Sequence, residues 1–188
     1  MPDKKISDLT SAGALSGSEQ IPLVQSGTTV KTLLSTLSTF VSADINTNAV
    51  NRLTVKLSQA INKGQAVYVS GANGTNILVS KASNASEPTS SKTIGLLETT
   101  GAINAILNVI TDGLLTGLNT NSATIGDPVW LGVDGALIYG LINKPYAPAH
   151  LVYIGVVTRV SATVGEILVK VQNGAELKEI HDVDLITN

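Results

Sequence analysis

Short runs of valine, isoleucine and leucine, separated by glycine, asparagine and aspartate, fill residues 51–175. β-branched residues favour strands, and Asn-Gly or Asp-Gly pairs supply the positive φ angles that tight turns require. The run AVYVSG at 66–71 leads into Asn73-Gly74, and DPVWLG at 127–132 leads into Asp134-Gly135. Roughly eight to ten short strands are indicated, which predicts a mainly β fold, a compact barrel or sandwich.

These two runs belong to a longer internal repeat. Ordered segments of the first half recur in the second half at offsets of 60 to 62 residues. The matched pairs are 53–74 with 115–135, 92–100 with 152–160, and 102–113 with 163–174. The order predicts a pseudo-duplicated β domain with units 52–113 and 114–174 that share a core. Chance similarity between glycine-flanked strands is the alternative.

Residues 1–50 carry a different pattern. The run IPLV at 21–24 predicts a strand, and Gly27 predicts a turn after it. An apolar stripe at helical spacing then predicts a short helix, formed by Leu33, Leu34, Leu37, Phe40 and Val41. This segment has too few apolar residues for a core of its own, so we expect it to pack on the β domain or on another chain. Residues 176–188 have no counterpart in the repeat and are interpreted as a C-terminal connector.

Composition narrows the function classes. Of 188 residues, 14% are charged and 3% are aromatic, and the formal net charge is −2. Because no lysine or arginine cluster is present, we expect no nucleic-acid partner. No apolar run approaches the ~20 residues of a membrane helix, so we expect no membrane insertion. Without cysteine, disulfides and thiolate metal sites are excluded. A weakly charged surface rich in Ser, Thr, Asn and Gly suits a subunit of a larger assembly.

Candidate catalytic chemistry is sparse. His150 and His181 lack metal-binding spacing and are interpreted as a loop and a connector histidine. The alternative is a cation held where three chains meet, by Glu179, His181, Asp182 and Asp184. Isolated acids occur at Glu98, Asp127 and Glu166, and neither a Gly-x-Ser-x-Gly elbow nor a phosphate loop is present. We therefore expect no enzyme and no cofactor.

The few aromatic residues suggest packing roles. Trp130 and Tyr68 occupy equivalent places in the repeat. Together with Tyr153, they are candidates for the core or for a contact between subunits of a trimer. The alternative is a sugar-binding platform made of Trp130, Tyr146 and Tyr153.

Two parts of the chain resemble bacteriophage fibre proteins, meaning tail fibres or head (capsid) fibres. The run KISDLTSAGALSGSEQIPLVQSGTTVKTLLSTLSTFV at 5–41 is similar to their N-terminal attachment segment. The motifs KGQAVYVSGANG, TIGLLETT, GDPVWLGVDG, NKPYAPAHLVYIGVV, GEILVKVQNG and ELKEIHDV, all within 63–183, are similar to a β domain that recurs in them. The resemblance covers nearly the whole chain. In similar proteins His181–Val183 leads into further shaft or receptor-binding domains.

The resemblance implies a non-enzymatic virion protein, assembled in the bacterial host cytoplasm. It implies a homotrimer whose N-terminal segment docks on other virion proteins, as a fibre or a fibre base. The attachment candidates are Ile6, Leu9, Ile21, Leu23, Leu33, Leu37 and Phe40. The alternatives are a capsid decoration protein and a carbohydrate- or receptor-binding module that binds a host surface glycan.

Overall fold

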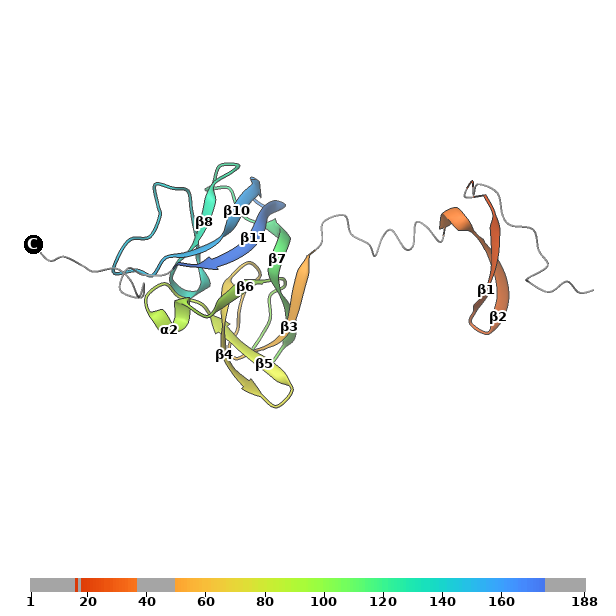
Figure 1. Ribbon diagram of the computed structural model, residues 1–188, viewed down its shortest axis with the longest axis horizontal. Coiled ribbons are helices and arrows are strands. Elements are labelled where there is room, and N and C mark those ends of the chain that lie inside the picture. Colours follow the sequence, from red (N-terminus) through yellow and green to blue (C-terminus); the bar gives the residue numbers. More distant parts are fainter. Residues whose placement is uncertain (1–15, 17, 37–49, 175–188) are drawn as a thin grey trace, which may run out of the picture. The chain divides into compact units, whose positions relative to one another are not determined.

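A computed structural model describes residues 16, 18–36 and 50–174, in two units, Met1–Thr47 and Asn48–Asn188. Figure 1 labels most of the elements. The first unit contains β1 (Gln20–Gln25) and β2 (Thr28–Leu33). The second contains β3 (Asn51–Leu57), β4 (Ala66–Asn73), β5 (Asn76–Lys81), α2 (Glu87–Ser90), β6 (Thr93–Leu97), β7 (Ile106–Leu118), β8 (Pro128–Leu131), the 3-10 turn η2 (Val133–Gly135), β9 (Leu137–Tyr139), β10 (Val152–Arg159) and β11 (Gly165–Asn173).

The first unit is an antiparallel hairpin. Its strands pair from Gln20 opposite Leu33 to Gln25 opposite Thr28. Ser26 and Gly27 both have positive φ, 50° and 77°, which matches the right-handed twist of the flanking strands. The predicted strand and turn are therefore present.

The helix prediction was wrong at Leu33, which lies in β2. Helical residues begin at Leu34 and run to Thr36 in the described part. The sequence between the turn and Leu33 is rich in threonine and valine, which favour strands, and the positive-φ turn brings it back along β1. Leu37, Phe40 and Val41 lie outside the described residues.

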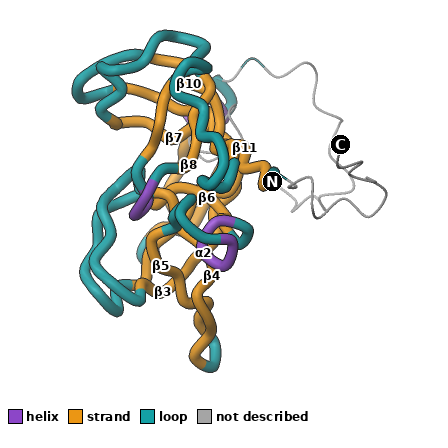
Figure 2. Tube along the Cα trace, turned by 90° about the vertical axis from the view of Figure 1, so that its left-hand side faces the viewer, coloured by secondary structure: helices purple, strands orange, loops and turns teal. Residues whose placement is uncertain are grey.

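The second unit begins with a closed barrel, which confirms the predicted mainly β fold. Five strands follow in the order β3-β5-β4-β6-β7, and antiparallel pairing between β7 and β3 closes the ring. The β4–β5 hairpin extends beyond the barrel (Figures 1 and 2). One core cluster of this unit contains Val55, Leu57, Ile61, Val67, Val79, Leu97 and Val109.

A second layer extends from the same sheet. β7 continues past the barrel and pairs with β11, and the order runs on through β10 and β8 to β9. The second core cluster contains Ala66, Ala82, Leu96, Ile110, Leu115, Leu118, Val129, Leu131, Val152, Ile154, Val157, Ile167 and Val169. Neighbouring residues of one strand, such as Val109 and Ile110, therefore join different cores. Successive side chains of a strand point to opposite faces, so β4, β6 and β7 form a wall buried on both sides.

Strand pairing repeats between the halves. In the first half Val67 pairs with Gly95 and Tyr68 with Thr93, so the register skips Ile94. The equivalent pairs in the second half are Val129 with Gly155 and Trp130 with Tyr153, so that Ile154 is skipped. These residues lie 60 to 62 positions after their counterparts, as in the sequence repeat. This shared register, including its irregularity, agrees with a duplicated unit.

The last match of the repeat is three residues out of register. When residues 102–113 are aligned with residues 163–174, the buried Val109 is aligned with the exposed Lys170. In the structure Leu53 pairs with Val109, and its counterpart Leu115 pairs with buried Ile167. The offset between these strands is therefore 167 − 109 = 58. A shift by an odd number of residues moves every side chain to the other face of the sheet. The buried positions therefore define the correct alignment of these strands, and the match of Gly113 with Gly174 does not.

The two halves differ in how they close. β5 bridges β4 and β3 in the first half, whereas the three-residue β9 pairs only with β8 in the described residues. The loop Lys63–Gln65 of the first half contacts η2, where Gln65 Nε2 donates to Asp134 O at 3.0 Å. A cavity of about 240 Å³ remains there, lined by Lys63, Gly64, Gln65, Leu118, Asn119, Gly135, Ala136, Leu137 and Tyr139.

Candidate binding site

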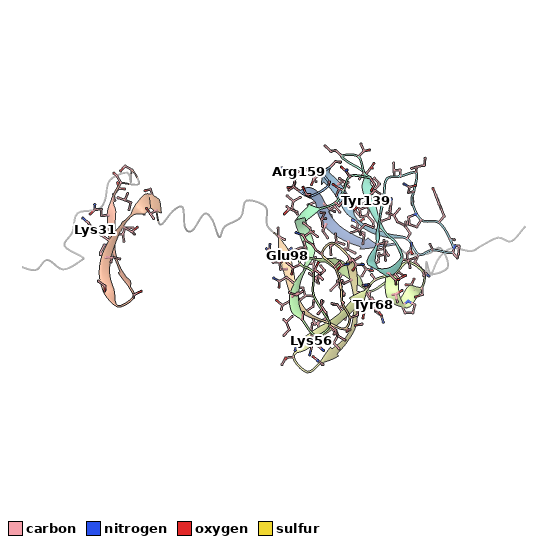
Figure 3. The ribbon with its side chains drawn as sticks, turned by 180° about the vertical axis from the view of Figure 1, so that it is seen from behind. Lys31, Lys56, Tyr68, Glu98, Tyr139 and Arg159 are labelled. Atoms are coloured by element: carbon pink, nitrogen blue, oxygen red, sulfur yellow. The ribbon has the colours of Figure 1, made fainter. Side chains whose placement is uncertain are left out.

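The acids singled out in the sequence have separate structural partners. Glu98, labelled in Figure 3, accepts from Arg52, whose Nε lies 3.0 Å from Oε1. Glu166 Oε1 lies 3.3 Å from Arg159 Nη1, and Asp127 Oδ2 accepts from the Thr124 amide at 2.7 Å. These side chains hold strands and turns together.

The Arg52–Glu98 pair has a clear electrostatic effect. Hydrogen bonding from the Arg52 guanidinium holds the pKa of the Glu98 carboxyl below its usual value, although partial burial opposes this shift. The same hydrogen bond raises the pKa of Arg52. The pair stabilises charged forms on both sides and ties β3 to the end of β6.

His150 ends a long loop after β9. Its backbone amide donates to Asn84 O at 2.8 Å, and its Nδ1 lies 2.8 Å from Glu87 Oε2 in α2. The predicted role as a loop histidine stays a prediction, and these contacts fix one end of that loop. His181 and its acidic neighbours lie outside the described residues.

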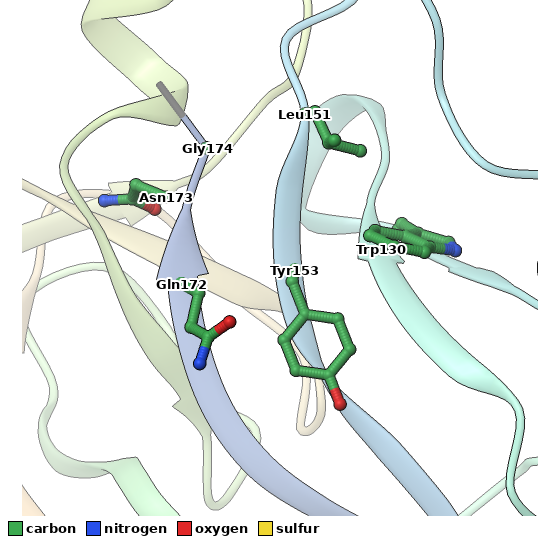
Figure 4. Close-up of a pocket in the computed structure, with 6 residues that line it drawn as sticks. All are labelled: Trp130, Leu151, Tyr153, Gln172, Asn173 and Gly174. Carbon is green, nitrogen blue, oxygen red and sulfur yellow. The ribbon is translucent and has the colours of Figure 1, made fainter. Parts of the chain in front are cut away.

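An aromatic pair lines one pocket of the β domain. Trp130 on β8 is opposite Tyr153 on β10, with ring centroids 5.6 Å apart and ring planes at 71°. Trp130 Nε1 donates to Gly140 O at 3.1 Å, and Lys144 Nζ lies 5.6 Å from the centroid of its ring. Figure 4 shows Tyr153 and Leu151 beside Trp130, with Gln172 on β11. The cavity of about 330 Å³ is lined by Trp130, Leu151, Tyr153, Gln172, Asn173 and Gly174.

The arrangement suits an apolar group better than a stacked sugar ring. The Trp130 side chain is only 8% exposed, and Lys144 stands over its ring. Sugar stacking needs an open aromatic face, which Trp130 does not present. The amides of Gln172 and Asn173 add polar groups to the pocket wall.

The structure separates the predicted aromatic candidates. Trp130 and Tyr153 come together, whereas Tyr68 packs against the second core from β4. Tyr146 is 74% exposed on the loop between β9 and β10. Burial raises the pKa of the Tyr139 hydroxyl, whose residue lines the smaller cavity.

An exposed aliphatic pair at the start of the loop between β9 and β10 was not foreseen from the sequence. Leu141 is 71% exposed and Ile142 is 93% exposed, directly after Gly140. Two adjacent large aliphatic residues next to a proline-rich polar loop were the available signal. Their position follows from the loop contacts, because the Gly140 amide donates to Pro128 O at 2.9 Å and Asn143 Nδ2 to Tyr139 O at 2.9 Å.

The attachment candidates fall in the first unit. Ile21 and Leu23 lie on β1, and Leu33 lies on β2. The others lie outside the described residues: Ile6, Leu9, Leu37 and Phe40. Their role in attachment stays a prediction.

No family model and no curated protein matches this chain. Among residues 16, 18–36 and 50–174, no three histidine or acidic side chains are grouped so that they could hold a metal ion. Within the same ranges, no helix has the length and apolarity needed to cross a bilayer.

Proposed function

We propose that this chain is a structural virion protein of a bacteriophage, a fibre or fibre base. It docks on the particle through residues 1–50 and assembles as a homotrimer through its β domain. The observation that carries the proposal is the N-terminal hairpin, a unit of its own that contains the IPLV run of the attachment-like segment.

The hairpin is physically suited to docking. A lone two-stranded hairpin is marginally stable in water, because it has too little apolar surface to bury. In the described residues β1 and β2 pair only with each other, so their outer edges are unpaired. Ile21 and Val30 are half-buried and Leu33 is 42% exposed. A partner surface would cover these side chains and pair the free edges.

The β domain supports the assembly part of the proposal. Large aliphatic side chains are exposed in several of its loops, including Ile125 at 69% and Ile142 at 93%. Only 14% of the residues of the chain are charged, so copies approach each other with little repulsion. Of these exposed side chains, Leu141 and Ile142 are adjacent, and a contact with another subunit would cover both.

Labelling of purified particles tests the proposal. A full chain with a C-terminal tag should label phage particles with gold, whereas a chain lacking residues 1–45 should fold and yet be absent from them. Far-UV circular dichroism of the shortened chain provides the folding control. A folded, stable monomer that never enters particles would contradict the proposal.

Tyr146 favours a second candidate function, a carbohydrate- or receptor-binding module. This residue is 74% exposed on the loop between β9 and β10, so its ring is open to a stacked sugar. If the chain has this function, Tyr146→Ala abolishes its binding on a glycan array and reduces adsorption of the phage particle to the host cell. Glycan-array silence of the unmodified chain would remove this candidate.

A further inference from the structure

The loop between β9 and β10 presents an apolar knob. Leu141 and Ile142, here called the knob, are 71% and 93% exposed. The loop is anchored at both ends, by the Gly140 amide on Pro128 O and by the His150 amide on Asn84 O, at 2.9 and 2.8 Å. Lys144, over the Trp130 ring, anchors its middle. A loop held in this way keeps the two side chains in solvent instead of folding them onto the domain.

The Trp130–Tyr153 pocket is apolar like the knob, and two of its lining residues adjoin the loop that carries the knob. Its walls contain Trp130, which bonds to the start of the loop, and Leu151, the residue that follows the loop. The cavity of about 330 Å³ has room for an aliphatic side chain. Ile142 is too exposed to be filling the pocket of its own copy. The pocket of each copy is therefore open to the knob of another molecule.

Charge does not oppose contact between the knob of one copy and the pocket of another. None of the six residues that line the pocket is charged. In 140–149, Lys144 is the only charged residue, and it already faces the Trp130 ring. Docking the knob would displace water from apolar surface without burying an unpaired charge.

We propose that Leu141 and Ile142 of one copy insert into the Trp130–Tyr153 pocket of a second copy. This inference rests on the proposed function, since it names the contact through which copies of the chain assemble. A knob and a pocket on the same molecule build a closed ring when each copy inserts into the next, or a two-fold dimer when insertion is reciprocal.

Cysteine cross-linking tests the contact directly, because the natural chain contains no cysteine. Chains with Ile142→Cys and chains with Gln172→Cys, carrying different tags, are produced together and oxidised mildly. We expect a disulfide-linked pair that contains both tags. The matched control replaces Ile142→Cys with Ile125→Cys, also an exposed isoleucine, at 69%. Equal yields of the mixed pair in test and control would overturn the inference.

Trp130 is the only tryptophan, so its emission reports on the pocket. In the full natural chain the emission should shift on dilution as the complex dissociates. Ile142→Ser should weaken self-association roughly tenfold or more, as truncation of a central contact does, and Ile125→Ser should not. The inference would be overturned if Trp130 emission did not change on dilution but changed when residues 176–188 were deleted. In that case the C-terminal residues of the same chain would occupy the pocket.

The outcomes separate this contact from the proposed function. If the chain self-associates and enters particles while Ile142→Cys and Gln172→Cys fail to cross-link, the contact is wrong and the function stands. If the cross-link forms and Ile142→Ser weakens association, but no chain enters particles, the contact stands and the virion role fails.

Discussion

At the residue scale, two equivalent glycines explain part of the repeat. Gly95 on β6 and Gly155 on β10 follow the skipped residues Ile94 and Ile154. A Cβ at either glycine would lie 2.1 Å from a backbone carbonyl oxygen of the next strand. The missing side chain lets the strands approach closely, so the Ile-Gly pair recurs in both halves for a steric reason.

Alanine at either glycine should destabilise the β domain. The Cβ meets backbone, which has little room to move, so Gly95→Ala and Gly155→Ala should each cost about 1–3 kcal/mol or more. Urea unfolding followed by Trp130 fluorescence measures this. Gly71→Ala is the control, since its nearest neighbour would be a Leu78 methyl carbon at 4.0 Å. An equal loss at all three positions would refute the steric argument.

The Arg52–Glu98 pair predicts a pH dependence. Because the folded-state pKa of Glu98 is lowered from 4.5, its contribution is present above pH 4.5 and is lost as the pH falls through the lowered value. Glu98→Gln should therefore reduce the free energy of unfolding at pH 7 by at most about 1 kcal/mol, since the pair is partly exposed. The difference from the natural chain should vanish in acid. Urea titrations across this range test it, and a difference that grows toward low pH would contradict the assignment.

At the scale of elements, β7 joins the two halves. Its first part pairs with β3 and β6, and its second part with β11. Val109 belongs to the barrel core and Ile110 to the second core, and both are almost fully buried. Because one continuous strand contributes to both cores, we expect the loss of one core to destabilise the other.

Truncation on β7 tests this coupling. Ile110→Ala should lower the free energy of unfolding by about 2–5 kcal/mol, because it leaves a cavity in a close-packed core. The domain should still unfold in one step, with circular dichroism and Trp130 fluorescence giving the same midpoint. Ile106→Ala, at a residue on the same strand that is 57% exposed, is the control and should have little effect. Separate transitions for the two probes would show that the halves unfold independently.

At the scale of the whole molecule, the two units are built separately. The first contains a two-stranded sheet and the second a nine-stranded sheet, with no strand pairing between them in the described residues. The knob and the pocket both lie in the second unit. Attachment and self-assembly, as proposed, therefore involve different parts of the chain.

Deletion of residues 1–47 tests this division. The remaining chain, 48–188, should unfold with the same thermal midpoint as the full chain, because the barrel and both core clusters lie within it. Differential scanning calorimetry measures the midpoint. A clear drop would mean that the first unit contributes to the stability of the β domain.

Local pattern was a good guide to strands and a poor guide to contacts between them. The turn at Gly27 and the strands around Val67 and Val129 were predictable, because β-branched runs and positive-φ turns are local properties. The helix stripe misled at Leu33, because aliphatic spacing over a few residues fits strand and helix alike. Of the pocket, Trp130 and Tyr153 were singled out, but not the wall formed by Leu151 and Gln172.

By itself the sequence determined that this chain is mainly β, and it predicted a duplicated second part in which Trp130 matches Tyr68. These properties follow from residue types at short spacing. Only the tertiary structure decided that the barrel closes through β3 and β7, that Ile167 corresponds to Val109, and that Leu141 and Ile142 are exposed on an anchored loop. Such features depend on which distant strands pair and which faces they bury, and burial of both faces of a shared wall is a property of the whole domain.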